Sequence, residues 1–429
     1  MRTPHRLAAL LAGVLTMTLA SCGADDAAGT VKLRMIESLT SPDRTKLLKS
    51  LITDFEQKNP GIKVELISPP LESADQKITQ VLQTKKGVDV LEVRDFTAKS
   101  FSNNGWLAEL PVGNWPGWNE LTDLTRKKAV EVGGKPYLIP YGFYEKVLFY
   151  RSDWLREAGI AQPPATWQEL YDAAKRLTDK GKRRYGYSFR GGKGGSDYAV
   201  MIVSAFNGDK VDPDKSFFLK DGKTIWSTPE AAQALDLFVR LFKEGSPADS
   251  VSWSYPEMVQ GFTSGVTGML IQDPEVIKTV EESALPKDGW STAPIPKGPG
   301  GHALQPVGYA GWGVTSFSTH KGEATKLVQF LSESAQSTKF AKGNSLIPIA
   351  KAAQQDPQFS QGAWKAYLDA QGDDKQVITI RPVDYPGWSE WQQAADKDIQ
   401  SLLTGDKTAQ DVLSGWDAFW TDQARKKTS

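Results

Sequence analysis

Five acidic side chains are the first candidates for chemistry in this chain: Glu37, Asp95, Glu145, Asp273 and Glu390. Two carboxylates are enough for glycoside hydrolysis, in which one protonates the leaving group and the other attacks or activates water. Carboxylates in a neutral, aromatic cleft can instead accept hydrogen bonds from sugar hydroxyls, with aromatic rings against the C–H face of the sugar. The residue types fit both uses, catalysis and binding.

Other catalytic groups are scarce. After residue 21 the chain has two histidines, His302 and His320, and one cysteine, Cys22. A Ser-His-Asp triad, a Cys-His pair or a His-rich zinc site therefore lacks parts. The glycine-rich loop 190–197 is not a Walker phosphate loop, because Lys193 is followed by glycine. We expect no metal and no cofactor.

The N-terminus indicates where the protein works. A basic start with Arg2 and Arg6 precedes an apolar run from Leu7 to Leu19 and the small residues before Cys22. This order is typical of a secretory signal. Leu-Ala-Ser-Cys resembles the bacterial lipobox, which implies a signal peptide at 1–21, a lipidated Cys22 and a tether at 22–30. Acyl chains on Cys22 would hold the protein outside the cytoplasmic membrane.

Charge and length limit the remaining possibilities. Lysine plus arginine and aspartate plus glutamate both number 51, so no net charge attracts nucleic acid or an anionic membrane. The roughly 400 residues after the signal exceed what one hydrophobic core usually supports. We therefore expect two domains.

The first part of the chain alternates strands and helices. Residues 31–36, 62–67 and 88–93 read as strands, and the segment 43–58 has the apolar face of a helix. Short connections between such elements predict a parallel sheet covered by helices. Ligands bind beyond the carboxyl ends of the strands in these sheets. Those ends carry Glu37, Ser38, Arg94 and Asp95.

The stretch 133–178 carries the most specific pattern. It contains IPYG, then LFYRSDWLREAGI, then PPATWQELYDAAKRLT, in which Thr166 and Glu169 predict a capping box. This order resembles the central signature of the family 1 extracellular solute-binding proteins, the sugar receptors of ABC importers. The resemblance implies a non-enzymatic protein that captures a mono- or oligosaccharide and delivers it to permease subunits driven by cytoplasmic ATPases. A lipid-anchored glycoside hydrolase stays the alternative.

The resemblance also implies the organisation. We expect the two-lobe α/β fold of type II periplasmic binding proteins, monomeric, with discontinuous lobes joined by crossings near Tyr141, Val307 and Ser345. The first lobe would hold 31–140 and 308–345, and the second 141–307 and 346–429. The predicted substrate site draws on both lobes and on the crossings, and comprises Glu37, Ser38, Arg94, Asp95, Phe143, Tyr144, Arg190, Gly194, Ser196, Asp197, Trp253, Asp273, Tyr309, Trp312 and Trp388.

Trp312 is the predicted main stacking platform. It lies between Gly311 and Gly313, which leave its faces uncovered by neighbouring side chains, and it follows a segment that resembles the family's hinge. The turn at Asp273 departs from the family, which often has Gly-Pro-Trp there. A stacking tryptophan is therefore missing at that turn, which puts in doubt any substrate carried over from a relative.

Overall fold

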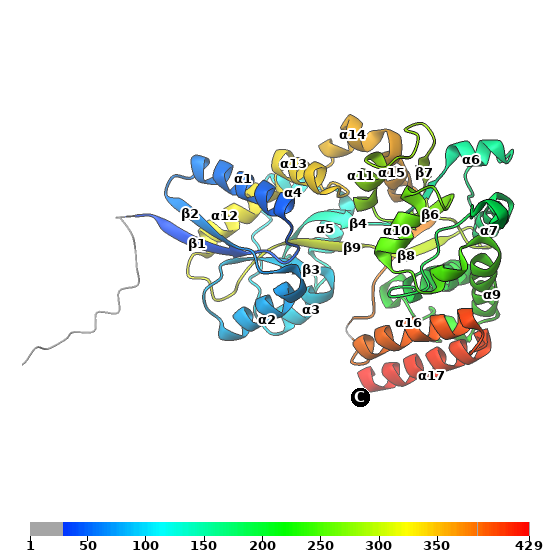
Figure 1. The fold of residues 1–429 in the computed structure, drawn as a ribbon. Coiled ribbons are helices and arrows are strands. Elements are labelled where there is room, and N and C mark those ends of the chain that lie inside the picture. The colour runs from blue at the N-terminus through cyan, green and yellow to red at the C-terminus, as the bar shows by residue number, and fades with distance from the viewer. Residues whose placement is uncertain (1–28, 384, 429) are drawn as a thin grey trace, which may run out of the picture.

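The computed structural model describes residues 29–383 and 385–428 and has two α/β lobes joined by extended strands (Figure 1). The predicted signal peptide, Cys22 and most of the predicted tether lie outside the described residues. Within the described part, none of the helices is both long and apolar enough to span a bilayer.

The first lobe is built on a five-stranded sheet in the order β2-β1-β3-β9-β4. β1 is parallel to β2 and β3, as the alternation of strands and helices predicts, whereas β9 is antiparallel to β3 and β4. β9 comes from much later in the chain and fills the place between β3 and β4. The strands are β1 (Val31–Ile36), β2 (Ile62–Ile67), β3 (Val90–Arg94), β4 (Ile139–Tyr144) and β9 (Gly308–Val314).

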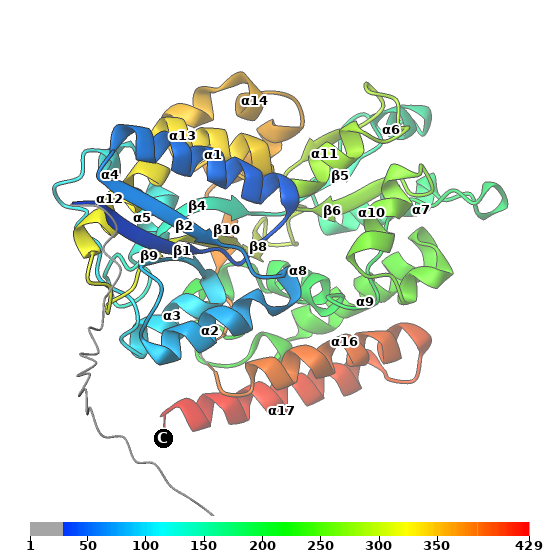
Figure 2. The same cartoon turned by 60° about the vertical axis from the view of Figure 1, so that its left-hand side comes forward.

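Helices cover both faces of this sheet. Figures 1 and 2 show α1 and α13 on one side and α2 and α3 on the other. α1 begins at the Ser41 cap and buries Leu48, Leu51 and Phe55, and Phe55 meets Phe330 of α12 at 5.4 Å. The helices of this lobe are α1 (Pro42–Lys58), α2 (Ala74–Thr84), α3 (Asp95–Asn103), α4 (Gly117–Glu120), α5 (Asp123–Ala129), α12 (Lys321–Ser332) and α13 (Ser334–Asn344).

The second lobe has smaller sheets and more helices. An antiparallel sheet has the order β6-β5-β7, and β8 pairs in parallel with β10. Its strands are β5 (Val147–Tyr150), β6 (Met269–Gln272), β7 (Ser291–Ala293), β8 (Ala303–Pro306) and β10 (Gln376–Thr379). Its helices are α6 (Ser152–Glu157), α7 (Trp167–Leu177), α8 (Ser196–Asn207), α9 (Pro229–Gly245), α10 (Tyr255–Thr263), α11 (Glu275–Glu281), α14 (Pro357–Ser360), α15 (Lys365–Gly372), α16 (Trp388–Thr404) and α17 (Ala409–Thr428).

Much of the tryptophan content lies in the core of this second lobe. Trp226, Trp391, Trp416 and Trp420 are buried, and the Trp391 ring lies 5.4 Å from Trp416 and 5.6 Å from Trp420. Phe217 adds edge contacts at 4.9 Å to Trp391 and Trp420. These contacts fix α16 and α17, at the end of the chain, against the rest of the lobe (Figure 1). Trp416 and Trp420, four residues apart on one face of α17, are therefore core residues.

Local signals in the sequence locate most elements correctly. The capping box of Thr166 and Glu169 is present at the start of α7. Residues 185–189 have the alternating aromatic side chains that are typical of a strand, but only one isolated bridge, between Tyr185 and Thr267, forms there. In that segment Tyr187 N donates to Gly245 and Ser188 N to Met269, so successive amides bond to different neighbours instead of one partner strand.

The crossings lie at the ends of β4 and β9. β4 stays in the first-lobe sheet as far as Tyr144, which is paired with Gly308 at the start of β9. At the third predicted crossing, the chain stays on the first lobe beyond Ser345. There Thr122 N donates to Ile349 O, and Lys351 N donates to Glu120 O. The lobe boundaries at 140 and 345 stay predictions.

Candidate functional site

A cavity of about 700 Å³ lies where the two lobes meet. Its walls carry four aromatic rings and seven charged side chains, together with a few small or neutral residues. The lining residues are Leu39, Arg94, Asp95, Phe96, Tyr144, Lys146, Asp197, Asp273, Glu275, Gly308, Tyr309, Arg381, Val383, Trp388 and Gln392.

The sheet topology explains why these residues meet. The parallel strands β1 and β3 end at the same edge of the sheet, where Leu39 follows β1 and Arg94 is the last residue of β3. Because β9 is antiparallel, its first residues, Gly308 and Tyr309, lie at that edge too. From the second lobe, the start of α8 supplies Asp197, and the turn between β6 and α11 supplies the other acidic residues.

Ion pairs hold two arginines at the first-lobe side of the cavity. Arg381 Nη1 lies 3.3 Å from Asp95 Oδ2, and Arg94 Nη1 lies 3.6 Å from Asp75 Oδ2. The Arg94 guanidinium also covers the ring of Phe96 at 4.6 Å from the ring centre. Burial raises the pKa of Asp95, although the positive charges of Arg381 and Arg94 oppose that shift. The Arg381–Asp95 pair links the segment after β10 to the end of β3.

The second-lobe wall carries acidic groups with perturbed pKa values. Burial raises the pKa of Asp273, with Lys146 and Arg190 opposing the shift. Partial desolvation and the charge of Asp273 raise the pKa of Glu275 to about 7, while part of the Glu275 side chain stays exposed at the cavity. Burial lowers the pKa of Lys146. The backbone of Lys146 is fixed on both sides by Gln305, whose side chain accepts from Lys146 N and donates to Lys146 O at 2.9 Å each.

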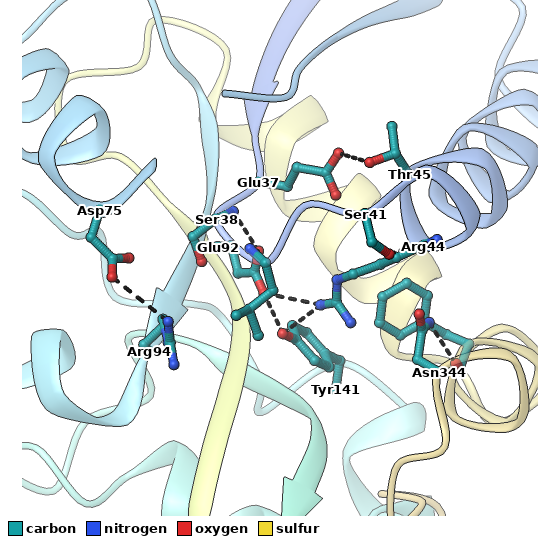
Figure 3. A network of polar contacts seen from close by, with 12 residues as sticks. Glu37, Ser38, Ser41, Arg44, Thr45, Asp75, Glu92, Arg94, Tyr141 and Asn344 are labelled. Atoms are coloured by element: carbon teal, nitrogen blue, oxygen red, sulfur yellow. Dashed lines mark hydrogen bonds and ion pairs between the residues drawn. The ribbon is translucent and has the colours of Figure 1, made fainter. Parts of the chain in front are cut away.

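A buried polar network supports the loop that leads to Leu39 (Figure 3). Glu92 of β3 accepts hydrogen bonds from Ser38 N at 2.6 Å and from Leu39 N at 3.0 Å. Arg44 of α1 lies 3.0 Å from the same carboxylate and donates to Tyr141 Oη at 2.6 Å, while the Tyr141 hydroxyl donates to Glu92. Burial alone would raise the pKa of Glu92, but Arg44, Tyr141 and the two amides lower it below its ordinary value.

Seven of the predicted substrate residues line the cavity. They are Arg94, Asp95, Tyr144, Asp197, Asp273, Tyr309 and Trp388. The sequence reading missed eight other lining residues: Leu39, Phe96, Lys146, Glu275, Gly308, Arg381, Val383 and Gln392. Phe96, Lys146, Glu275 and Gly308 each directly adjoin or lie within two residues of a predicted one, so a wider window would have found them. Arg381 and Val383 follow β10, where no local signal points to a ligand.

Trp312 does not line the cavity, and the predicted exposed ring is wrong. Its side chain is 1% exposed and packs 4.8 Å from Tyr141 and 5.8 Å from Phe340. The flanking glycines serve close packing: a Cβ on Gly311 would lie 2.3 Å from Ile139 O. Trp312 pairs with Glu92 inside the sheet, several residues away from the edge that faces the cleft.

The glycine-rich loop before α8 bonds to protein. Gly194 N and Ser196 N donate to the Asp396 carboxylate of α16, and Ser196 Oγ donates to it at 2.7 Å. The N–H groups of Gly194 and Ser196, which a helix start would otherwise leave free for a ligand, are therefore occupied by Asp396. Arg190 Nε donates to Lys193 O at 2.7 Å, and its guanidinium covers Gly194. Arg190, Gly194 and Ser196 lie behind the cavity wall, with Asp197 at its surface.

The four other predicted residues lie outside the cavity lining. Glu37 is buried and accepts from Thr45 Oγ1 at 2.7 Å and from Ser68 Oγ at 2.6 Å. Ser38 is bound through its amide to Glu92. Phe143 is buried against Tyr309, and Trp253 packs over Gly261. These four side chains therefore contribute to packing and hydrogen bonding within the protein.

Comparisons with known proteins agree with one another. Residues 41–338 match the family described as bacterial extracellular solute-binding protein. A putative binding protein of Brucella abortus is 27% identical over 93% of each chain, and an uncharacterized lipoprotein of Streptomyces antibioticus is 25% identical over 95% of this chain and 90% of its own. The solved structure of the sugar-binding protein MalE from Xanthomonas citri superposes with a TM-score of 0.76 at 19% identity, and covers 93% of this chain and 98% of its own.

Proposed function

This chain belongs to the bacterial extracellular solute-binding proteins, and we propose that it captures a carbohydrate between its lobes and delivers it to an ABC importer. The observation that carries the proposal is the cavity of about 700 Å³ at the lobe junction, because it combines aromatic rings with several charged hydrogen-bonding groups. A pocket of this composition suits a sugar ring, which has an apolar C–H face and a rim of hydroxyls. The sugar-binding protein with the same fold supports this ligand class.

We assign the stacking role to Trp388 and Phe96. Trp388 opens α16 at the cavity wall and is half-buried, stacked on Trp391 at 5.8 Å. Phe96 is 37% exposed, which is unusual for a phenylalanine next to a strand end. Their rings would cover the C–H faces of the sugar, while the carboxylates and arginines of the walls bind its hydroxyls.

Ligand binding would shift the lobes toward a closed arrangement, because a sugar that contacts both walls has a higher affinity for the state in which they approach. The closed form would then dock on the permease subunits. A lipidated Cys22 would keep the protein at the outer side of the membrane, and the name of the Streptomyces antibioticus relative as a lipoprotein supports this anchor.

Calorimetric titration with neutral mono- and oligosaccharides and sugar alcohols tests the proposal. We expect saturable binding by at least one compound, and a loss of about tenfold or more in affinity for Trp388→Ala. The matched control is Trp118→Ala, since Trp118 of α4 is half-buried outside the cavity lining and should leave the affinity unchanged.

Chromatography of the titrated mixtures distinguishes the alternative, a glycoside hydrolase. Of the five candidate carboxylates, Asp95 and Asp273 line the cavity, and Asp95 is engaged by Arg381. Glu145 is buried outside the cavity lining, where burial raises its pKa to about 8. Release of a shorter sugar by wild type, abolished in Asp273→Asn, would overturn the binding-protein proposal.

A further inference from the structure

Some charged side chains at the cavity walls form ion pairs and some do not. Among those that do not, negative charges outnumber positive ones. In the first lobe, Arg94 is paired with Asp75, and Asp95 with Arg381. Among the described residues, no ion pair engages Asp197, Asp273 or Glu275 on the second-lobe wall. Lys146 beside them and Arg190 behind them supply two positive charges, because both act on Asp273. Three carboxylates against two cations leave one negative charge.

A buried oxygen atom without a hydrogen-bond partner at the second-lobe wall indicates what kind of ligand group would bind there. Asp273 Oδ1 is buried without a hydrogen-bond partner in the described part of the protein. A buried acceptor without a donor costs free energy, so this carboxylate oxygen favours a ligand that supplies a hydrogen-bond donor. The rings of Tyr144 and Trp388, which also line the cavity, present electron-rich faces that attract a cation.

The other charges around Glu275 do not remove the need for a cation. It faces Asp273 on its own lobe and Arg44 and Arg94 on the first lobe, with the hydroxyls of Tyr144 and Tyr255 nearby. Arg44 is already bound to Glu92, and Arg94 to Asp75. When the lobes close and exclude water, an uncompensated carboxylate becomes more costly. A neutral sugar would leave this charge uncompensated.

We infer that the solute is a carbohydrate with a positively charged amine, seated against the carboxylates of Asp197, Asp273 and Glu275. This inference rests on the proposed function and narrows it to amino sugars or their short oligomers. An ammonium group has three donors and one positive charge, so it matches the unpartnered acceptor and the residual negative charge together. The arginines of the first lobe and the aromatic rings would then bind the remaining hydroxyls and the C–H faces.

The test uses matched sugars that differ at one substituent. Glucose, glucosamine, N-acetylglucosamine and glucuronate are titrated by calorimetry into wild type at pH 7.5, followed by cellobiose, the deacetylated chitobiose and its diacetylated form. We expect the amine-bearing member of a series to bind at least about tenfold more tightly than its neutral or acetylated counterparts. Added salt should weaken the binding of the amine more than that of the neutral sugar.

Substitutions in the second-lobe wall test whether its carboxylates cause the preference for the amine. Glu275→Gln and Asp197→Asn should each reduce the ratio of amine affinity to neutral-sugar affinity by about tenfold, because they remove the negative charge and keep a hydrogen-bonding group for hydroxyls. Glu281→Gln removes the same charge at the exposed far end of α11 and should change neither. Thermal melting of each apo variant shows that a loss is not caused by unfolding.

The outcomes separate the two proposals. Tighter binding of a neutral, acetylated or acidic sugar than of any amine would overturn the amine inference and leave the carbohydrate-binding proposal intact. Equal affinity for amine and neutral members, or a preference that survives both variants, would also overturn it. If no carbohydrate of either panel binds, both proposals fail.

Discussion

Arg44→Met should destabilise the protein because it removes the cation that pairs with the buried Glu92. Arg44 and Glu92 are 7% and 0% exposed, and their atoms lie 3.0 Å apart. Removing one partner of such a pair leaves a buried charge, which costs about 3–5 kcal/mol. With about 400 ordered residues and about 2.1 cal/mol/K of unfolding entropy per residue, a loss of about 4 kcal/mol lowers the melting temperature by about 5 °C.

A double-mutant cycle isolates the pair. Glu92→Gln keeps an acceptor for Ser38 N and Leu39 N but removes the charge. The cost of Arg44→Met with Glu92→Gln should therefore be smaller than the sum of the single costs by at least about 1 kcal/mol. Lys49→Met, an exposed change on the same helix, is the control. Urea unfolding measures the free energy of unfolding of the four proteins of the cycle and of the control.

The pH dependence follows from the pKa of Glu92. In wild type this pKa lies below its ordinary value, so the pair contributes stability above the unfolded-state pKa and loses it as pH falls through the folded-state pKa. In Arg44→Met, burial without the cation raises the pKa of Glu92. The variant's deficit should therefore shrink as pH falls from about 7 to about 5. Additive single costs, or a deficit below about 0.5 kcal/mol at neutral pH, would refute the assigned role of the pair.

Four further predictions follow from other parts of the molecule. Trp312→Ala should lower the free energy of unfolding by about 3–5 kcal/mol, because the ring is 1% exposed, and a variant as stable as wild type in urea would contradict its core position. Asp396→Ala should increase amide hydrogen exchange at Gly194 and Ser196, whose N–H groups it binds; unchanged exchange would show that other groups order the loop. For an amine-bearing sugar, wild-type affinity should fall relative to that of Glu275→Gln as pH drops from 8 to 6, since the pKa of Glu275 is about 7 and its protonated form is neutral, whereas protonation of the ligand affects both proteins alike; identical pH profiles of the two proteins would count against this. Cys22→Ser should release the protein from membranes or leave its signal uncleaved, as fractionation and mass spectrometry would reveal; a processed, membrane-bound variant would argue against lipidation.

Local patterns predicted the elements well, and they predicted the site only in part. The predicted end of the strand 88–93 placed Arg94 and Asp95 at the cavity, because parallel strands end at a common edge. Trp312 was misplaced because the sequence does not reveal that β9 runs antiparallel, which puts Tyr309 at the edge instead. Arg381 was missed because its role depends on a long-range pairing with Asp95. The glycines that flank Trp312 predict an uncovered ring, whereas in the structure they allow close packing, and only the three-dimensional contacts reveal this.

The insertion of β9 between β3 and β4 affects how the chain can fold while it is being synthesised from its N-terminus. In the described sheet, β4 is joined to the other strands through β9. Until Gly308–Val314 has been made, the facing edges of β3 and β4 therefore lack their partner, although nearly all of the second-lobe sheet strands have by then appeared. Unpaired strand edges are where wrong association begins. A holdase chaperone that keeps such edges apart would accordingly protect the chain most during this interval.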